Sequence, residues 1–291
     1  HLVDSETDYT IEIGNGRNRL DSIVSSIMDS FDFEKEGITH VMVQGDTATA
    51  FAMALSAFHH NIPVIHLEAG MRTYDIQNPY PEEFYRQSIS KIATLHLTPT
   101  SYESGYLLQE NVEGTIRVVG NTVLDNLVGI PSSYENFVLI TMHRRENHKN
   151  IEEYFKTFSK LAEDNPDLNF IFPIHPNPNV QKYKHLLKNI SVIEPLPYDD
   201  MISHISRCRL IISDSGGIQE EASFFKKRII VCRETTERKA SLSTSSFLCH
   251  NPSELEGLFA HLKDDYIVEE ECPYGDGTSS EKIVEVLKCV L

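Results

Sequence analysis

The chain has 291 residues, of which 40% are hydrophobic and 24% charged, a composition typical of a globular protein long enough for two cores. Its 43 acidic and 26 basic residues give a formal net charge of −17, which argues against general affinity for nucleic-acid backbones or anionic lipid surfaces. The five cysteines are scattered without a CxxC pair, so neither a disulfide framework nor a zinc site is indicated, and we expect a reducing cytoplasm.

In the first half of the chain, short apolar runs rich in Val and Ile alternate with longer amphipathic runs. The short runs are THVMVQ (39–44), IPVIHLE (62–68), TLHLTP (94–99) and TIRVVG (115–120). This alternation predicts βα units around a parallel sheet whose strands are buried on both faces. Every apolar run is far shorter than the roughly 20 residues of a membrane helix, so we expect no membrane partner.

The pattern pauses at GIPSSYEN (129–136), which has the composition of a linker, and then resumes. The strand-like runs of this second series are FVLITMH (137–143), LNFIFPIH (168–175), RLIISD (209–214) and RIIVC (228–232). We therefore predict an α/β protein with Rossmann-like domains at residues 1–130 and 131–274. A helix within 275–291 could pack back on the first domain. Ligands of such sheets bind beyond the carboxyl ends of the strands, here in the cleft between the domains.

Acidic side chains follow two of the strands predicted in the first half. Asp46 comes after one strand and Glu68 directly after another, while Glu82 stands where a helix begins. Each also has a simpler interpretation. Asp46 could cap a helix, Glu68 could be a solvated acid, and Glu82 could compensate the helix dipole or pair with Arg86 at i, i+4.

In the second half, His143 and Arg144 stand at the end of a predicted strand. They could belong to a surface turn, but an arginine at a strand end could also clamp an anion. His175 leaves another strand between prolines, which restrict where its imidazole points. A structural histidine is the alternative for His175.

The segment RLIISDSGGIQEEA is the most specific cluster. A strand meets Ser215, Gly216 and Gly217 and then a helix, so backbone N–H groups converge at a helix N-terminus suited to a phosphate. Glu220 and Glu221 could reach sugar hydroxyls from one turn inside the helix. Neither a Walker loop nor GxGxxG is present here, which disfavours nucleotide hydrolysis and NAD binding.

Two arginines follow the next predicted strand. Arg233 and Arg238, within RETTER, are candidate countercharges for a diphosphate. The sequence contains no HExxH and no paired His/Asp spacing that calls for a metal.

From about residue 39 onward these motifs, in order, resemble those of the non-hydrolysing bacterial and archaeal UDP-N-acetylglucosamine 2-epimerases. They are GDTATA, HLEAGMRT, NPYPEEFYR, GNTVLDNL, TMHRREN, PIHPNPNV, SDSGGIQEEA, RETTER and PYGDG. The resemblance implies two Rossmann-like domains of the glycosyltransferase-B type and usually a homodimer. It also implies a cytoplasmic isomerase of cell-surface polysaccharide biosynthesis that interconverts UDP-GlcNAc and UDP-ManNAc. In that family UDP is eliminated to give 2-acetamidoglucal and then adds back, and no redox cofactor is needed.

Carried over by motif, the resemblance gives roles to individual residues. Asp46, Glu68 and Glu82 match the acid/base carboxylates of the family, and His175 matches the histidine that assists the leaving UDP. Which carboxylate serves which face of the sugar stays open at this point. Crowding should raise the pKa of at least one of them toward the working pH.

The nucleotide contacts carried over lie in the second half. Residues 215–217 match the diphosphate loop, Glu221 the ribose contact, and Arg238 a further contact with UDP. Arg72 and Arg86 match a subgroup of bacterial enzymes that bind a second UDP-GlcNAc as an allosteric activator.

Two departures from the family pattern affect these expectations. The first βα unit, with its GTRPE-like loop, is expected to be absent, because HLVDSETDY resembles the region after it. RKASLSTSS replaces the usual RPEA segment. The alternatives are an epimerase or hydrolysing epimerase for a related UDP sugar, a glycosyltransferase with an acceptor site, and a non-catalytic nucleotide-sugar-binding protein.

Overall fold

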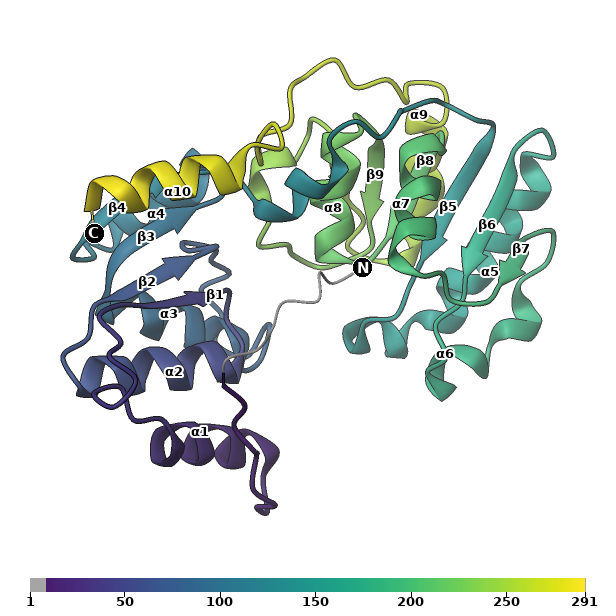
Figure 1. Cartoon of the computed structure of the whole chain (residues 1–291). Helices are drawn as coiled ribbons and strands as arrows, with labels where there is room; N and C mark the ends of the chain where they lie inside the picture. The colour runs from purple at the N-terminus through teal and green to yellow at the C-terminus, as the bar shows by residue number, and fades with distance from the viewer. Residues whose placement is uncertain (1–8, 291) are drawn as a thin grey trace. The chain divides into compact units, whose positions relative to one another are not determined.

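The computed structural model describes residues 9–290, which form two compact units treated separately below (Figure 1). One unit comprises residues 123–277, and the other comprises residues 9–122 together with 278–290. The chain therefore passes from one unit to the other twice, at 122/123 and at 277/278. Of HLVDSETDY, only Tyr9 lies within the described residues. Within residues 9–290, no helix combines the length and apolarity that a membrane crossing requires.

The first unit is built on a four-stranded parallel sheet in the order β1-β2-β3-β4. The strands are β1 (Val41–Gln44), β2 (Val64–Leu67), β3 (Ala93–Thr98) and β4 (Thr115–Val118). The helices of this part of the chain are α1 (Arg19–Ser30), α2 (Ala48–His59), α3 (Glu82–Ile92), α4 (Ser101–Gln109) and α10 (Ser279–Val290). The 3-10 helix η1 (Thr122–Leu127) begins at the first passage between the units.

The central strands β2 and β3 are largely buried on both faces of this sheet, whereas the edge strand β1 buries only alternate residues, Val41 and Val43. Val41, Val43 and Val64 pack against residues of α2 and α3, including Ile89. On the other face, Ile283 of α10 packs in the cluster that contains Ile65, Leu95, Leu97 and Val119. The helix α10 thus covers a sheet face whose strands lie far before it in the sequence.

The second unit has a six-stranded parallel sheet in the order β10-β9-β8-β5-β6-β7. In chain order the strands are β5 (Phe137–Thr141), β6 (Asn169–Pro173), β7 (Ser191–Ile193), β8 (Leu210–Ser213), β9 (Arg228–Val231) and β10 (Ser246–Leu248). The α-helices are α5 (Ile151–Asp164), α6 (Pro178–Gln181), α7 (Tyr198–Arg207), α8 (Gly216–Phe224) and α9 (Leu255–Leu262). Four 3-10 helices join them: η2 (Arg145–Lys149), η3 (Lys184–Leu186), η4 (Lys239–Ser241) and η5 (Pro252–Glu254).

The order of this sheet reverses at β5. The chain lays down β6 and β7 on one side of β5 and then returns to add β8, β9 and β10 on the other. Loops that leave neighbouring strands in opposite directions open a crevice at such a point, where α/β sheets bind their ligands. Strands β5 and β8 flank this crevice, with Thr141 paired in register with Ser213.

Helices cover both faces of the six-stranded sheet (Figure 1). Helices α5 and α9 bury one face, with Val138 and Ile140 among the strand residues, while α7 and α8 bury the other, with Phe137 and Leu139. The predicted α/β class with two parallel sheets is confirmed.

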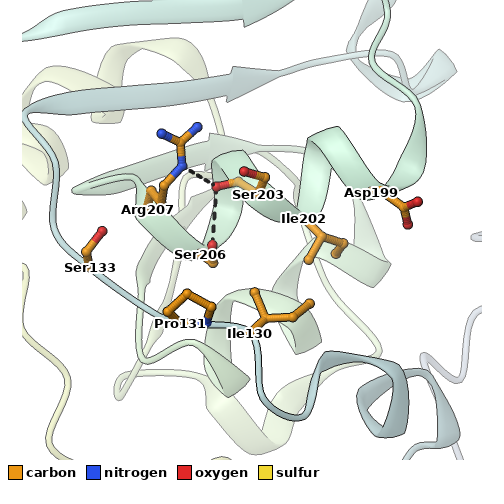
Figure 2. Close-up of a pocket in the computed structure, with 8 residues that line it drawn as sticks. All are labelled: Ile130, Pro131, Ser133, Asp199, Ile202, Ser203, Ser206 and Arg207. Carbon is orange, nitrogen blue, oxygen red and sulfur yellow. Dashed lines mark hydrogen bonds between the residues drawn. The ribbon is translucent and has the colours of Figure 1, made fainter.

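The segment with the composition of a linker, residues 129–136, is hydrogen-bonded within the second unit. Ser133 N donates to Ser206 O at 3.0 Å and Glu135 N to Arg207 O at 2.7 Å. A pocket of about 210 Å³ lies between this segment and α7, where Figure 2 shows Ser206 and Arg207 both donating to the carbonyl of Ser203. Its lining residues are Ile130, Pro131, Ser133, Asp199, Ile202, Ser203, Ser206 and Arg207.

Candidate functional site

In the first unit, two predicted site carboxylates lie together at the carboxyl ends of β1 and β2. Asp46 follows Gly45 in the turn after β1, and Glu68 follows β2 with a φ of 63°. Few non-glycine residues adopt positive φ, and such strained positions concentrate at functional sites. A Cβ built on Gly45 would lie 3.3 Å from Glu68 Oε2. The carboxylate of Glu68 therefore rests against the turn that carries Asp46.

Arg86 of α3 supplies a positive charge to these acids. Its Nη2 forms an ion pair with Asp46 Oδ2, and its Nη1 lies 3.4 Å from Glu83 Oε2. Arg86 pairs with Asp46 and Glu83 rather than with Glu82, the partner that i, i+4 spacing allows. Among the residues described, Glu82 Oε2 is buried without a hydrogen-bond partner. A buried, unsatisfied carboxylate oxygen is costly and therefore marks a candidate for binding or catalysis.

His66, which the sequence did not single out, holds the turn of Asp46 in place. It is fully buried in β2, and its Nε2 lies 2.9 Å from Gly45 O. Burial lowers the pKa of His66 to about 3, so the imidazole is neutral and Nε2–H is the donor. Its Nδ1 is buried with no hydrogen-bond partner in the described part of the chain.

Arg72, a predicted allosteric residue, is fully buried in the first unit. Its Nε and Nη2 donate to the two carboxylate oxygens of Glu110 at 2.6 and 2.9 Å, and Nη2 also donates to Ser90 Oγ at 2.9 Å. This bidentate pair gives Arg72 a structural role. A contact of Arg72 or Arg86 with a second nucleotide sugar stays a prediction.

In the second unit, the predicted phosphate loop forms the N-terminus of α8. Ser215 is the N-cap residue, but its side chain makes no capping hydrogen bond. The first-turn N–H groups are therefore left without a side-chain cap, an arrangement suited to an anion. Gly216 is buried, and a Cβ there would lie 2.6 Å from Arg238 Nη1, whereas Gly217 is exposed with nothing within 4 Å of such an atom.

The two arginines predicted to meet a diphosphate are already paired with carboxylates. Arg233 Nε lies 2.9 Å from Glu146 Oε1, and its Nη1 lies 3.0 Å from Glu237 Oε2. Arg238 Nε lies 2.7 Å from Glu220 Oε1, and its Nη1 pairs with Glu237. Both guanidinium groups are nearly buried, so in this structure they hold the protein together at the base of α8. Their contact with a diphosphate stays a prediction.

Glu221, the predicted ribose contact, is almost buried in α8. Burial raises its pKa, and a hydrogen bond from Tyr198 opposes this change. Arg144 is half-buried and forms no ion pair within residues 9–290, unlike Arg233 and Arg238; Arg145 forms none either, but it is exposed. Burial and the nearby charge of Arg233 lower the pKa of Arg144. Arg144 is thus the arginine best placed to take an external anion.

Asp214, to which the sequence assigned no role, fixes the loop after β5. It is fully buried between β8 and α8, and its Oδ2 accepts N–H from His143 at 3.0 Å, from Arg144 at 2.9 Å and from Asn147 Nδ2 at 3.0 Å. The His143 Nδ1 lies 3.3 Å from Asp214 Oδ1. Burial lowers the pKa of His143, and the charge of Asp214 acts in the opposite direction.

His175 lies beside His143 at the ends of β6 and β5. Their rings stack with centroids 5.5 Å apart and planes 21° apart. His175 Nδ1 accepts N–H from Asn177 at 3.1 Å. Both histidines line a pocket of about 200 Å³, which the remaining lining residues make largely apolar: Thr141, Met142, Pro173, Pro195, Leu196, Met201 and Ile218.

The described residues contain no group of three or more His, Cys, Asp or Glu side chains that could hold a metal ion. Within its own unit, each predicted set of site residues is brought close together at the carboxyl ends of parallel strands. One set contains the carboxylates Asp46 and Glu68 with Arg86. The other joins the stacked histidines to the loop that Asp214 holds.

Comparisons with known proteins point to one family along nearly the whole chain. The family model for UDP-N-acetylglucosamine 2-epimerase matches residues 3–288. The chain is 37% identical over 329 residues to the UDP-N-acetylglucosamine 2-epimerase of Campylobacter jejuni, covering 99% of this chain and 85% of that protein.

Two solved structures are similar as well. The Neisseria meningitidis UDP-GlcNAc 2-epimerase bound to UDP-GlcNAc has a TM-score of 0.82 at 34% identity, covering 93% of this chain and 81% of that chain. The S. aureus MnaA–UDP structure has a TM-score of 0.86 at 32% identity, covering 98% of this chain and 83% of that chain. The predicted glycosyltransferase-B class is confirmed.

Proposed function

Because the chain belongs to the UDP-N-acetylglucosamine 2-epimerase family, a family of isomerases, we propose that it interconverts UDP-GlcNAc and UDP-ManNAc. In the forward direction a base takes the proton from C2, the bond from C1 to the diphosphate oxygen breaks, and UDP leaves with the bonding electron pair. The product is 2-acetamidoglucal. UDP then adds back to C1 while C2 receives a proton on the opposite face, so atoms and charge balance over the cycle.

The observation that carries this proposal is the group of acids in the first unit. Glu68 rests against the turn of Asp46, Asp46 is paired with Arg86, and Glu82 has a buried oxygen without a partner among the described residues. A proton beside an acetamido group is weakly acidic, so its removal requires positioned acid/base groups. We assign this proton transfer to Asp46, Glu68 and Glu82.

We assign the nucleotide to the second unit. The uncapped first turn of α8 and the guanidinium of Arg144 can bind the diphosphate, because both offer N–H donors to an anion. His143 and His175 lie at the rim of the adjoining pocket and can stabilise the charge that develops on the leaving group. Glu221 and Tyr198 are assigned to the ribose hydroxyls.

Three further assignments rest on the family resemblance alone. We propose that the protein is a homodimer, that it works in the cytoplasm, and that its product enters cell-surface polysaccharide synthesis. Light scattering on the purified protein measures the first of these. A monomeric mass at micromolar concentration would contradict it.

The activity is tested by incubating the protein with UDP-GlcNAc in D₂O and following the proton spectrum by NMR. We expect UDP-ManNAc signals to grow and the C2 proton signals to disappear as deuterium enters. Glu82→Gln should lower kcat by about 10²-fold or more, since a positioned acid/base group contributes that much. Glu36→Gln, an exposed acid of the same unit, is the matched control and should leave kcat unchanged.

Three outcomes would overturn the proposal. Unconverted substrate with an unexchanged C2 proton would show that the protein is not an epimerase for this sugar. Free ManNAc and UDP as the only products would show a hydrolysing enzyme. Conversion that occurs only when an acceptor is supplied would identify a glycosyltransferase.

A further inference from the structure

The buried carboxylate of Asp214 lies where the order of the second sheet reverses. Asp214 follows β8, and its two carboxylate oxygens point at the loop after the neighbouring strand β5. Three N–H groups donate to Oδ2, from the backbone of His143 and Arg144 and from the side chain of Asn147, and the His143 N–H also lies 3.1 Å from Oδ1. The oxygen that faces the His143 ring, Oδ1, is therefore also an acceptor.

The nearby carboxylate favours one nitrogen of His143 as the carrier of the proton in the neutral ring. Nδ1 lies 3.3 Å from Asp214 Oδ1, and an acceptor at that distance favours a proton on Nδ1. Because the two nitrogens lie on different edges of the imidazole, Nε2 is then free to take up a proton on the side away from Asp214. The His143 side chain is 41% exposed, so that side is open to a ligand.

The neighbouring ring has the opposite arrangement. His175 Nδ1 accepts the backbone N–H of Asn177 at 3.1 Å, so in the neutral ring the proton lies on Nε2. The stacked pair thus presents one nitrogen that can accept a proton, on His143, and one N–H donor, on His175. Only His143 has a buried carboxylate to balance the charge that protonation brings.

We infer that Asp214 is a positioning residue that acts through His143, holding it as the Nδ1–H tautomer and stabilising its imidazolium beside the leaving diphosphate. The catalytic consequence rests on the proposed function. When the bond from C1 breaks, the electron pair passes to the diphosphate oxygen, and the Nε2–H of the imidazolium donates a hydrogen bond to that oxygen. The interaction reverses when UDP adds back, and no proton is gained or lost.

Three charged or titratable groups face His143 and set its protonation. Asp214, after β8, favours the imidazolium, whereas Arg144 on the same loop and His175 after β6 disfavour it, as does burial. Asp214 is the one member of this set that raises the pKa of His143. Its loss should therefore lower the pKa of His143 further and make the imidazolium harder to form beside the diphosphate.

The substitution Asp214→Asn separates this role from simple support of the loop. An Asn oxygen at the position of Oδ2 can still accept the three N–H groups that hold the loop, while the amide NH₂ takes the position of Oδ1 and faces His143 Nδ1. His143 Nδ1 must then accept a hydrogen bond from this amide, so the proton of the neutral ring moves to Nε2. Asn147→Ala is the matched control, because it removes a loop contact, at 3.0 Å from Oδ2, without changing the atom that faces Nδ1.

The decisive measurement is the tautomer of His143 in the substrate-free protein, read from long-range ¹H–¹⁵N NMR correlations. We expect Nδ1–H in the unmodified protein and in Asn147→Ala. In Asp214→Asn we expect Nε2–H and a lower pKa of the ring, because the carboxylate that raises it is gone. The spectrum of the unmodified protein requires no variant, so the inference stays testable if Asp214→Asn does not fold. Finding Nε2–H in the unmodified protein would overturn it.

Turnover gives the second test. Asp214→Asn should lower kcat by about 10²-fold with a smaller change in KM. In a protein that already carries His143→Gln, adding Asp214→Asn should not lower kcat further. Losses that multiply in the double variant would show that Asp214 acts as loop support alone. The tautomer is measured without substrate, so a failure of the proposed function, seen as absent conversion of UDP-GlcNAc, is recognised separately.

Discussion

The unmodified protein is expected to lose stability between pH 7 and pH 5. Replacing His66 by Gln should make this loss smaller by about 2 kcal/mol. The cause lies in the surroundings of the ring. His66 is fully buried, its Nε2–H donates to Gly45 O, and its Nδ1 has no partner in the described structure. A second proton on Nδ1 would therefore be a buried charge without an acceptor.

The magnitude follows from the difference in pKa between the two states. The pKa of His66 is about 3 in the folded protein against 6.5 for an ordinary histidine. Between these values the unfolded chain binds more protons, so stability decreases as the pH falls through 6.5 toward 3. At pH 5 the unfolded side chain lies about 1.5 units below its pKa, and at about 1.4 kcal/mol per unit this amounts to about 2 kcal/mol.

The assay is urea denaturation followed by circular dichroism at pH 5, 6, 7 and 8, with the free energy of unfolding taken by linear extrapolation. Gln can still donate an N–H to Gly45 O, so the hydrogen bond is kept while the titration is lost. His96 is also buried with a lowered pKa. Its contribution has the same sign and cancels in the difference between the unmodified protein and the variant.

His40, which is exposed on the same unit, provides the control. His40→Gln should leave the dependence of stability on pH unchanged. The reasoning would be refuted if His66→Gln kept the full pH dependence. A His66 Cε1 proton resonance that titrates near pH 6.5 in the native protein would refute it as well.

Two further predictions concern stability at pH 7, measured by the same unfolding assay. Arg86→Met should lower the free energy of unfolding by about 3 kcal/mol, because it leaves Asp46 and the buried Glu83 without their positive partner. A loss under about 1 kcal/mol would show that these ion pairs are solvated. Gly70→Ala should cost about 3 kcal/mol, since φ is 90° and the new Cβ would lie 2.5 Å from Glu103 O, whereas Gly37→Ala, with positive φ but open space, should cost about 1 kcal/mol. Equal costs for the two glycines would contradict the steric argument.

The sequence identified the central strands because their periodicity reflects burial. Strands such as β5 and β8 are apolar at nearly every position, as strands covered on both faces must be. It did not identify β7 and β10, which have three residues each and lie at the edges of the sheet. Segments that short carry too few residues for a period to be read.

The candidate site was predictable in part for a related reason. Polar residues directly after buried strands meet at one edge of a parallel sheet, and this reasoning indicated Asp46, Glu68, His143 and His175. The partners of these residues could not be predicted, because they depend on which strands are neighbours. Asp214 reaches the loop after β5 only because the chain returns to place β8 beside β5. The pairing of Arg86 with Asp46 likewise joins residues from distant parts of the sequence.

The two passages of the chain between the units have a consequence for synthesis on the ribosome. Residues 123–277 form one uninterrupted segment, so this unit can fold as soon as it has emerged. The other unit needs α10, whose Ile283 covers Ile65 and Leu95. Its sheet must therefore wait, with one apolar face uncovered, while 155 intervening residues are translated. An apolar sheet face left uncovered on a nascent chain is prone to aggregation, and α10 removes this exposure once it has docked.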